Sequence, residues 1–242
     1  IEALARLRGM YALALWDARE CRGWLARDPL GIKPLFWHAG DDGGVRFASE
    51  TKALVAGGLA ARLDPAALHL VMNFRYLPGA GSLFEGVGQL PPGHVLAWTL
   101  PGRHAVRALP ASRVAAPGGS LLDALGDSVR AHLTADVEVG TYLSGGIDSA
   151  TITALAQAAL AQGGDAPPST APLRTFTVDA GDDPAEARNA ARTAALLGVD
   201  NLQAQVDSGA DTLAAVIWHT ELPKVNALQV GLLAAHAARH VK

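Results

Sequence analysis

Cysteine, long apolar runs and a strong charge of one sign are all scarce in this sequence. The single cysteine, Cys21, excludes an internal disulfide framework and favours a reducing compartment, the cytoplasm. Charged residues make up 18% of the chain and the formal net charge is −3, so neither nucleic acid nor a membrane surface is expected as a partner. No apolar run is long enough to cross a bilayer, and the chain opens without a signal-peptide pattern.

The length of the sequence allows one large domain or two modest ones. Residues 1–100 contain short apolar segments separated by Pro, Gly and Asp, which is typical of a largely antiparallel domain. Residues 10–17 alternate large and small apolar side chains and predict a strand that is buried on both faces. Ser49 and Asp64 are expected to cap two helices of this domain.

The sequence pattern changes after this first part. Residues 101–119 are rich in Pro, Gly, Ala and Arg without periodicity, which predicts a domain linker. In residues 120–242, apolar strands alternate with helices, and this alternation predicts a parallel sheet covered by helices on both faces. The strands are expected at residues 137–143, 173–179 and 201–206.

The most informative stretch is Ser144-Gly145-Gly146-Ile147-Asp148-Ser149. It lies between an expected strand and an expected helix, an arrangement that directs free backbone N–H groups at an anion. Its two glycines let the main chain approach such an anion, and its two serines add hydroxyl donors. The carboxylate of Asp148 fits beside phosphates when Mg²⁺ lies between them. The stretch therefore predicts a cradle for the phosphates of ATP with Mg²⁺.

A simpler interpretation of the same stretch is a tight strand-to-helix turn, in which Asp148 only complements the helix dipole. The G-x-x-x-x-G-K-[ST] pattern and the G-x-G-x-x-G pattern are both absent from the sequence. The common ATPase or GTPase cradle and the dinucleotide fold are therefore not indicated.

The stretch resembles the pyrophosphate-binding loop of the N-type ATP pyrophosphatases, which include asparagine, GMP, NAD and argininosuccinate synthetases. Residues 9–17, 25–36, 47–54 and 90–94 resemble the later part of the class II glutamine amidotransferase domain. An amidotransferase-like part followed by a part with the S-G-G-x-D-S loop resembles the arrangement of glutamine-hydrolysing asparagine synthetase and its β-lactam synthetase relatives. The resemblance implies two domains: the C-terminal part of an antiparallel α+β Ntn-type glutaminase domain, and then an incomplete α/β parallel-sheet ATP pyrophosphatase domain.

This resemblance assigns roles to individual residues. It implies that ATP and its pyrophosphate are bound by Leu143, Ser144, Gly145, Gly146, Asp148 and Ser149, with Asp148 acting through Mg²⁺. Val178 matches an apolar residue beside the adenine, although its position alone indicates an ordinary core residue of a strand. Glu221 matches an acidic residue near the substrate pocket. Glu186 matches an acidic position at a helix start, which a charge favourable to the helix dipole explains equally well.

The implied activity is that of an ATP-dependent amidoligase, which adenylates aspartate or a related carboxylate and then amidates it with glutamine-derived ammonia. The expected partners are small molecules (ATP, the carboxylate and glutamine). A homodimer is one option for the oligomeric state, which the sequence does not decide. Two alternatives remain: a ring-closing ligase like β-lactam synthetase, and a nucleotide-binding remnant without catalysis.

Both ends of the chain depart from the family pattern. The glutaminase nucleophile of the family is an N-terminal cysteine, but this chain begins with Ile1, and Cys21 is interpreted as an incidental thiol in a turn. The family's second loop, Ser-Gly-x-Gly-x-Asp-Glu, is expected shortly beyond Lys242. We therefore expect a fragment that lacks both ends, assign no catalytic residue within it, and expect no glutaminase turnover and little or no synthesis from it alone.

Overall fold

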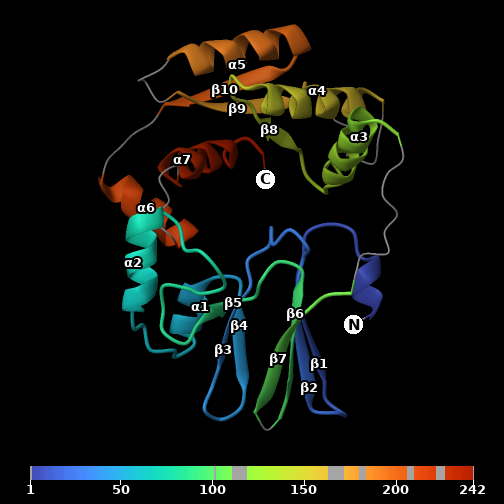
Figure 1. The fold of residues 1–242 in the computed structure, drawn as a ribbon. Coiled ribbons are helices and arrows are strands. Elements are labelled where there is room, and N and C mark those ends of the chain that lie inside the picture. The colour runs from blue at the N-terminus through green and yellow to red at the C-terminus, as the bar shows by residue number, and fades with distance from the viewer. Residues whose placement is uncertain are drawn as a thin grey trace. The chain divides into compact units, whose positions relative to one another are not determined.

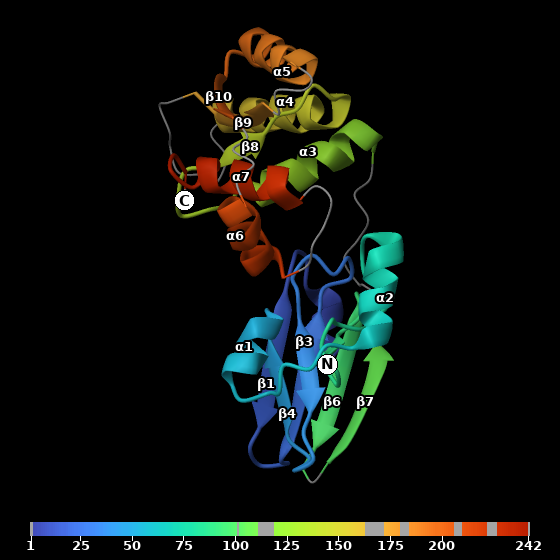
Figure 2. The same cartoon turned by 90° about the vertical axis from the view of Figure 1, so that its left-hand side faces the viewer.

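The computed structural model describes residues 2–100, 102–110, 119–162, 172–179, 184–205, 210–221 and 227–241. The chain divides into two compact units. The first unit comprises Ile1–Ala115 with Glu221–Pro223, and the second comprises Ala116–Thr220 with Lys224–Lys242. Figures 1 and 2 show the strands of the first unit and the sheet and helices of the second.

The first unit contains two antiparallel sheets. One has the strand order β1-β2-β6-β7, with β1 at Ala12–Asp17, β2 at Arg22–Arg27, β6 at His94–Thr99 and β7 at Arg103–Ala108. The other has the order β4-β3-β5, with β3 at Phe36–Ala39, β4 at Val45–Ala48 and β5 at Gly88–Gln89. Apolar side chains from both sheets meet in one core, formed by Leu25, Leu35, Leu90, Leu96 and Trp98 with Trp37 packed against it.

Among the described residues, the first unit also contains the 3-10 helix η1 at Glu2–Arg6, α1 at Thr51–Ala56 and α2 at Pro65–Phe74. Asp64 caps α2 as the sequence predicts, because its side chain accepts hydrogen bonds from the backbone N–H groups of the first turn. At α1 the N-cap is Glu50 rather than Ser49, and it makes no side-chain capping bond. The acceptors for the first turn of α1 come from elsewhere in the chain.

Strand β1 is not buried on both faces, and this prediction is wrong. Leu15 is 63% exposed and Trp16 is 48% exposed. β1 is an edge strand of its sheet and pairs with β2. Its alternation of large and small apolar residues therefore does not indicate a strand in the middle of the sheet. Trp16 stacks on Trp98 of the core, with ring centroids 6.2 Å apart.

The linker expected over residues 101–119 is shorter in the structure, because Arg103–Ala108 forms β7 and pairs with β6 in an antiparallel register from His94↔Ala108 to Thr99↔Arg103. All six residues of β7 are exposed. A strand at a sheet edge is held by backbone hydrogen bonds and needs no apolar pattern, so composition did not reveal it. Residues 111–118 of the expected linker lie outside the described residues.

Two buried charged residues that are adjacent in the chain, Arg27 and Asp28, organise the turn after β2. Arg27 is 6% exposed, and its guanidinium donates hydrogen bonds of 2.7 Å each to the carbonyl oxygens of Lys33, Leu90 and Gly31. The carboxylate of Asp28 accepts from backbone N–H groups of the turn. Burial raises the pKa of Asp28, but these hydrogen bonds outweigh it and the pKa is lowered. The pair therefore holds the turn between the two sheets.

The second unit is a parallel sheet with the strand order β10-β9-β8, formed by β8 at Gly140–Tyr142, β9 at Arg174–Asp179 and β10 at Asp200–Gln205. Its helices are α3 at Leu121–His132, α4 at Ile147–Ala161, α5 at Pro184–Leu197, α6 at Ala210–Thr220 and α7 at Ala227–Ala237. Figures 1 and 2 show α5 and α7 on opposite sides of the sheet. The sheet is therefore parallel and covered on both faces, as the alternation of strands and helices predicts.

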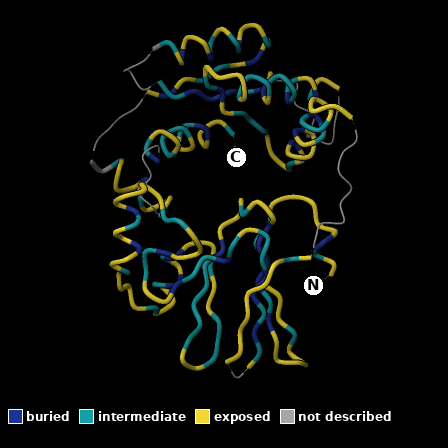
Figure 3. Tube along the Cα trace, viewed as in Figure 1, coloured by how far each residue is buried: buried dark blue, intermediate teal, exposed yellow. Residues whose placement is uncertain are grey.

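The core of the second unit joins α3, α4 and α5 to the sheet. Its buried members are Val129, Leu133, Leu143, Ala156, Ala159, Leu173, Ala190, Ala194 and Val199. Figure 3 shows the contrast between the buried residues of β9 and the exposed outer turns of α5. Within the described ranges, no helix combines the length and apolarity that crossing a membrane requires.

Candidate nucleotide-binding site

The predicted phosphate loop connects the carboxyl end of β8 to the first turn of α4. Leu143 is 2% exposed and donates its backbone N–H to the carbonyl oxygen of Phe176 at 2.9 Å, which fixes the start of the loop at the sheet edge. Gly146 is the N-cap of α4 and supplies no side-chain bond to the helix. The first N–H groups of an α-helix have no partner within the helix. They are therefore available to an anion beyond the carboxyl ends of the strands, where open α/β sheets bind ligands.

Hydrogen bonds between Ser144 and Ser149 connect the two ends of the loop. Ser144 donates its backbone N–H to Oγ of Ser149 at 3.0 Å, and the two hydroxyl oxygens lie 2.8 Å apart. Gly146 donates its N–H to Oγ of Ser144 at 3.2 Å. A hydroxyl both donates and accepts, so each serine can keep a bond within the loop while facing a phosphate oxygen.

The two loop positions Gly145 and Gly146 are occupied by glycine for different structural reasons. A Cβ on Gly145 would lie 3.2 Å from Cβ of Asn189 and 3.3 Å from both Cα and the carbonyl oxygen of Glu186, so Gly145 lets α5 pack against the loop. A Cβ on Gly146 would meet only Oγ of Ser144, at the ordinary distance of 3.4 Å, and Gly146 has φ −90°. Packing therefore explains Gly145, whereas the missing side chain of Gly146 leaves room for a ligand.

Asp148 lies in the first turn of α4 with an exposed carboxylate. In the part of the chain that the structure describes, no hydrogen bond or ion pair engages this carboxylate, and no cluster of three metal-binding side chains occurs. A Mg²⁺ ion keeps water and phosphate oxygens as most of its ligands in nucleotide sites. The free carboxylate of Asp148 therefore fits a Mg²⁺ ion that phosphate oxygens hold from the other side.

Val178 and Glu186 lie in the same unit as the loop. Val178 is half-buried near the carboxyl end of β9, one residue beyond Thr177, whose hydroxyl bonds to Leu143. Glu186 is in the first turn of α5, and its backbone lies against Gly145. The role of Val178 beside adenine stays a prediction.

Glu221 belongs to the first unit and caps α1. Its carboxylate accepts hydrogen bonds from the N–H and the hydroxyl of Thr51 and from the N–H of Lys52, the latter two at 2.8 and 2.9 Å. Nζ of Lys52 lies 3.5 Å from the same carboxylate, whose side chain is 11% exposed. These hydrogen bonds satisfy the largely buried carboxylate of Glu221 without any substrate, so the role of Glu221 in a substrate pocket stays a prediction. A separation of 170 residues hid this capping contact from sequence reasoning.

Glu221→Gln is expected to weaken the first unit in a pH-dependent way. Burial raises the pKa of Glu221, but the hydrogen bonds from Lys52 and Thr51 and the charge of Lys52 outweigh it, so the pKa falls below its ordinary 4.5. The carboxylate therefore contributes stability above that value and loses it as the pH falls through the lowered pKa. The variant is expected to lose about 1–2 kcal/mol of unfolding free energy at pH 7, and the difference is expected to close as the pH falls through the lowered pKa of Glu221.

Denaturant unfolding followed by tryptophan fluorescence measures this difference, because four of the five tryptophans lie in the first unit. Glu50→Gln is the matched control, since the exposed carboxylate of Glu50 also pairs with Lys52, at 2.7 Å, but caps nothing. An equal loss in both variants, or a gap that persists in acid, would contradict the capping role of Glu221.

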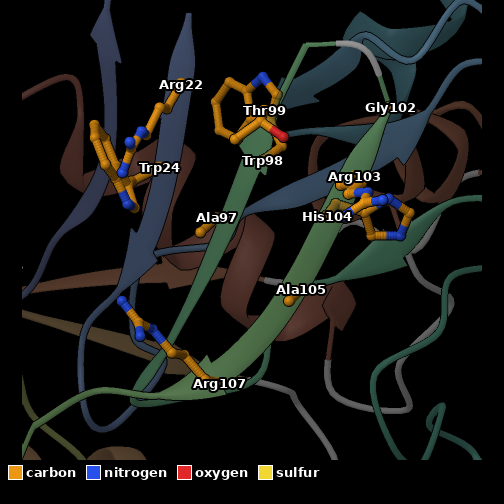
Figure 4. Close-up of a pocket in the computed structure, with 10 residues that line it drawn as sticks. All are labelled: Arg22, Trp24, Ala97, Trp98, Thr99, Gly102, Arg103, His104, Ala105 and Arg107. Carbon is orange, nitrogen blue, oxygen red and sulfur yellow. The ribbon is translucent and has the colours of Figure 1, made fainter. Parts of the chain in front are cut away.

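A separate open hollow of about 800 Å³ lies on the four-stranded sheet of the first unit. Its lining consists of Arg22, Trp24, Ala97, Trp98, Thr99, Gly102, Arg103, His104, Ala105 and Arg107. Figure 4 shows the side chain of Arg107 extending toward β2 while that of Arg103 lies beside His104. The guanidinium groups do not gather around one point, and Arg22 pairs with Glu20 at 2.8 Å. The hollow is therefore not assigned as an anion site.

The fold and the loop together define a class of two-domain proteins, in which an antiparallel domain precedes a parallel α/β domain with an S-G-G-x-D-S phosphate loop. Residues 1–106 match the family described as a glutamine amidotransferase domain, and residues 120–242 match the family described as asparagine synthase. The chain belongs to the asparagine synthase family.

Curated relatives agree with this assignment. The chain is 32% identical to asparagine synthetase (glutamine-hydrolyzing) 1 of Bacillus subtilis over 252 residues, which cover 99% of this chain and 38% of the relative. It is 33% identical to a putative asparagine synthetase of Mycobacterium tuberculosis, covering 100% of this chain and 38% of the relative. It is also 29% identical to amidase chyE of Penicillium rubens, covering 99% of this chain and 38% of the relative. The chain thus spans about two-fifths of the length of these proteins.

Proposed function

We propose that the intact protein is an ATP-dependent amidoligase that adenylates aspartate or a related carboxylate and then amidates it with ammonia from glutamine. The observation that carries this proposal is the exposed carboxylate of Asp148 beside Gly146 at the start of α4, which has no partner among the described residues. An acidic side chain next to an anion-binding helix start is useful when a divalent cation joins the two. The match of residues 1–106 to an amidotransferase domain supports glutamine as the nitrogen donor.

The proposed reaction has two steps. An oxygen of the substrate carboxylate attacks the α-phosphorus of ATP, the bond from that phosphorus to the bridging oxygen breaks, and pyrophosphate leaves with the electron pair. The nitrogen of ammonia then attacks the acyl carbon of the adenylate, AMP leaves, and the nitrogen loses a proton. Each step needs its departing negative charge to be stabilised.

The loop residues are proposed to stabilise the departing pyrophosphate. The N–H groups at the start of α4 and the hydroxyls of Ser144 and Ser149 donate to its oxygens, and the helix dipole favours the negative charge. Asp148 would hold Mg²⁺, which when bound supplies positive charge to the β- and γ-phosphates. Val178 is proposed to contact the adenine, and Leu143 to place its main chain beside the nucleotide. Cys21, an exposed thiol, has no part in this scheme.

Exchange of labelled pyrophosphate into ATP tests the proposal on the longest form of the protein that contains this chain. Exchange that depends on aspartate, or on one member of a panel of carboxylates, is expected because adenylation is reversible before ammonia attacks. A protein that binds Mg-ATP but exchanges with no carboxylate would contradict the ligase assignment and favour a nucleotide-binding remnant. Formation of a ring from a substrate that carries its own amine would instead support the β-lactam synthetase-like alternative.

A further inference from the structure

A chain of hydrogen-bonded polar side chains, with two buried threonines at its centre, connects β10 and β9 to the phosphate loop. Thr177 in β9 is 2% exposed, and its hydroxyl donates a hydrogen bond of 2.7 Å to the carbonyl oxygen of Leu143. The side-chain amide of Asn201 in β10 donates to Oγ1 of Thr177 at 2.8 Å. The hydroxyl of Thr177 therefore has its acceptor and its donor both fixed, and its direction is fully determined.

The same amide connects to a second buried hydroxyl. Nδ2 of Asn201 also donates to Oγ1 of Thr175 at 3.0 Å, and Thr175, which is 0% exposed, donates to the carbonyl oxygen of Asp200 at 2.8 Å. Oδ1 of Asn201 lies 3.3 Å from Nε2 of Gln203. Thr175 and Thr177 thus share a strand, a degree of burial and a donor, but only Thr177 reaches the loop.

The bond from Thr177 controls the first peptide of the loop. The carbonyl of Leu143 and the N–H of Ser144 belong to one planar peptide unit, so fixing the oxygen fixes the direction of the N–H. That N–H donates to Oγ of Ser149 at 3.0 Å, in the first turn of α4. The hydroxyl of Thr177 therefore acts, through one peptide plane, on the contact that closes the loop.

We propose that Thr177 is a positioning residue for the pyrophosphate loop and that Asn201 holds its hydroxyl in place. This inference rests on the proposed function, because it assumes that the loop binds the phosphates of ATP. A purely structural role would make Thr177 equivalent to Thr175, since both are buried hydroxyls that donate to a main-chain carbonyl oxygen and accept from the amide of Asn201. The affinity for a ligand that carries phosphates distinguishes a positioning role from a purely structural role.

The test compares Thr177→Val with Thr175→Val in the longest form of the protein that contains this chain. Both variants are expected to lose similar thermal stability. Thr177→Val alone is expected to bind Mg-ATP roughly tenfold more weakly, the size of one lost hydrogen bond, with unchanged affinity for adenosine, which has no phosphates. Thr177→Ser, which keeps the hydroxyl, is expected to bind Mg-ATP as the wild-type protein does. Titration calorimetry measures these affinities.

Four outcomes would overturn the inference. Wild-type protein that does not bind Mg-ATP would overturn the proposed function and this inference together. Wild-type binding that Thr177→Val leaves unchanged, or that Thr175→Val weakens equally, would overturn the inference alone. If Thr177→Val does not fold, Asn201→Ala replaces it, because this variant keeps both threonine hydroxyls but removes the amide that orients the hydroxyl of Thr177. A weaker affinity for Mg-ATP with unchanged affinity for adenosine would support the inference. An unchanged affinity for Mg-ATP would overturn it.

Discussion

Asp148→Asn is expected to reduce carboxylate-dependent exchange of pyrophosphate into ATP by a factor on the order of 100 or more. The amide keeps the size of the side chain but removes the charge that would hold Mg²⁺ against the phosphates. The folded protein is expected to be unaffected, because this exposed side chain makes no hydrogen bond or ion pair with the described residues. Initial rates of exchange at saturating Mg-ATP and carboxylate measure the effect.

Asp136→Asn is the matched control for this experiment. Asp136 is an exposed acidic residue of the same unit that precedes β8 and lies outside the loop. The control removes one negative charge from the unit without touching the expected Mg²⁺ site, and its exchange rate is expected to equal that of the wild-type protein. Undiminished exchange in Asp148→Asn would remove the proposed role of this carboxylate, and an equal loss in both variants would reduce that role to net charge.

Alanine at the two loop glycines is expected to separate folding from binding. Gly145→Ala places a Cβ 3.3 Å from backbone atoms of Glu186, so α5 or the loop must shift, at a cost of about 1–3 kcal/mol in unfolding free energy. Gly146→Ala has ordinary space and an ordinary φ, so it is expected to fold as the wild-type protein does. Its Cβ nevertheless enters the space left for the ligand, and the affinity for Mg-ATP is expected to fall roughly tenfold or more.

Thermal unfolding and titration with Mg-ATP on the two variants give the comparison. Each variant is the control for the other, because both add one methyl group to the same loop. A stable Gly146→Ala protein that binds Mg-ATP at full affinity would show that the ligand does not approach this residue. Full stability in Gly145→Ala would show that α5 accommodates the added Cβ without cost.

The buried hydroxyls beneath the loop and the carboxylate that caps α1 share one feature. In each case a side chain fixes backbone groups of a segment distant in the chain: Thr177 fixes the peptide after Leu143, and Glu221 fixes the first turn of α1. The resemblance to the family singles out Leu143 and Glu221 but predicts neither contact. Both determine the direction of backbone groups that local sequence leaves unspecified.

Features that depend on residues adjacent in the chain follow from the amino-acid sequence. Glycine, proline and capping residues impose local backbone geometry, so the helix after Asp64, the parallel unit and the strand-loop-helix around Gly146 were all predictable. Three features became visible only in the folded chain: Gly145 accommodates α5, β7 forms within the expected linker and pairs with β6, and Glu221 caps α1. These contacts join segments that are not neighbours in the chain, and no periodicity or local motif encodes which surfaces meet once the chain has folded.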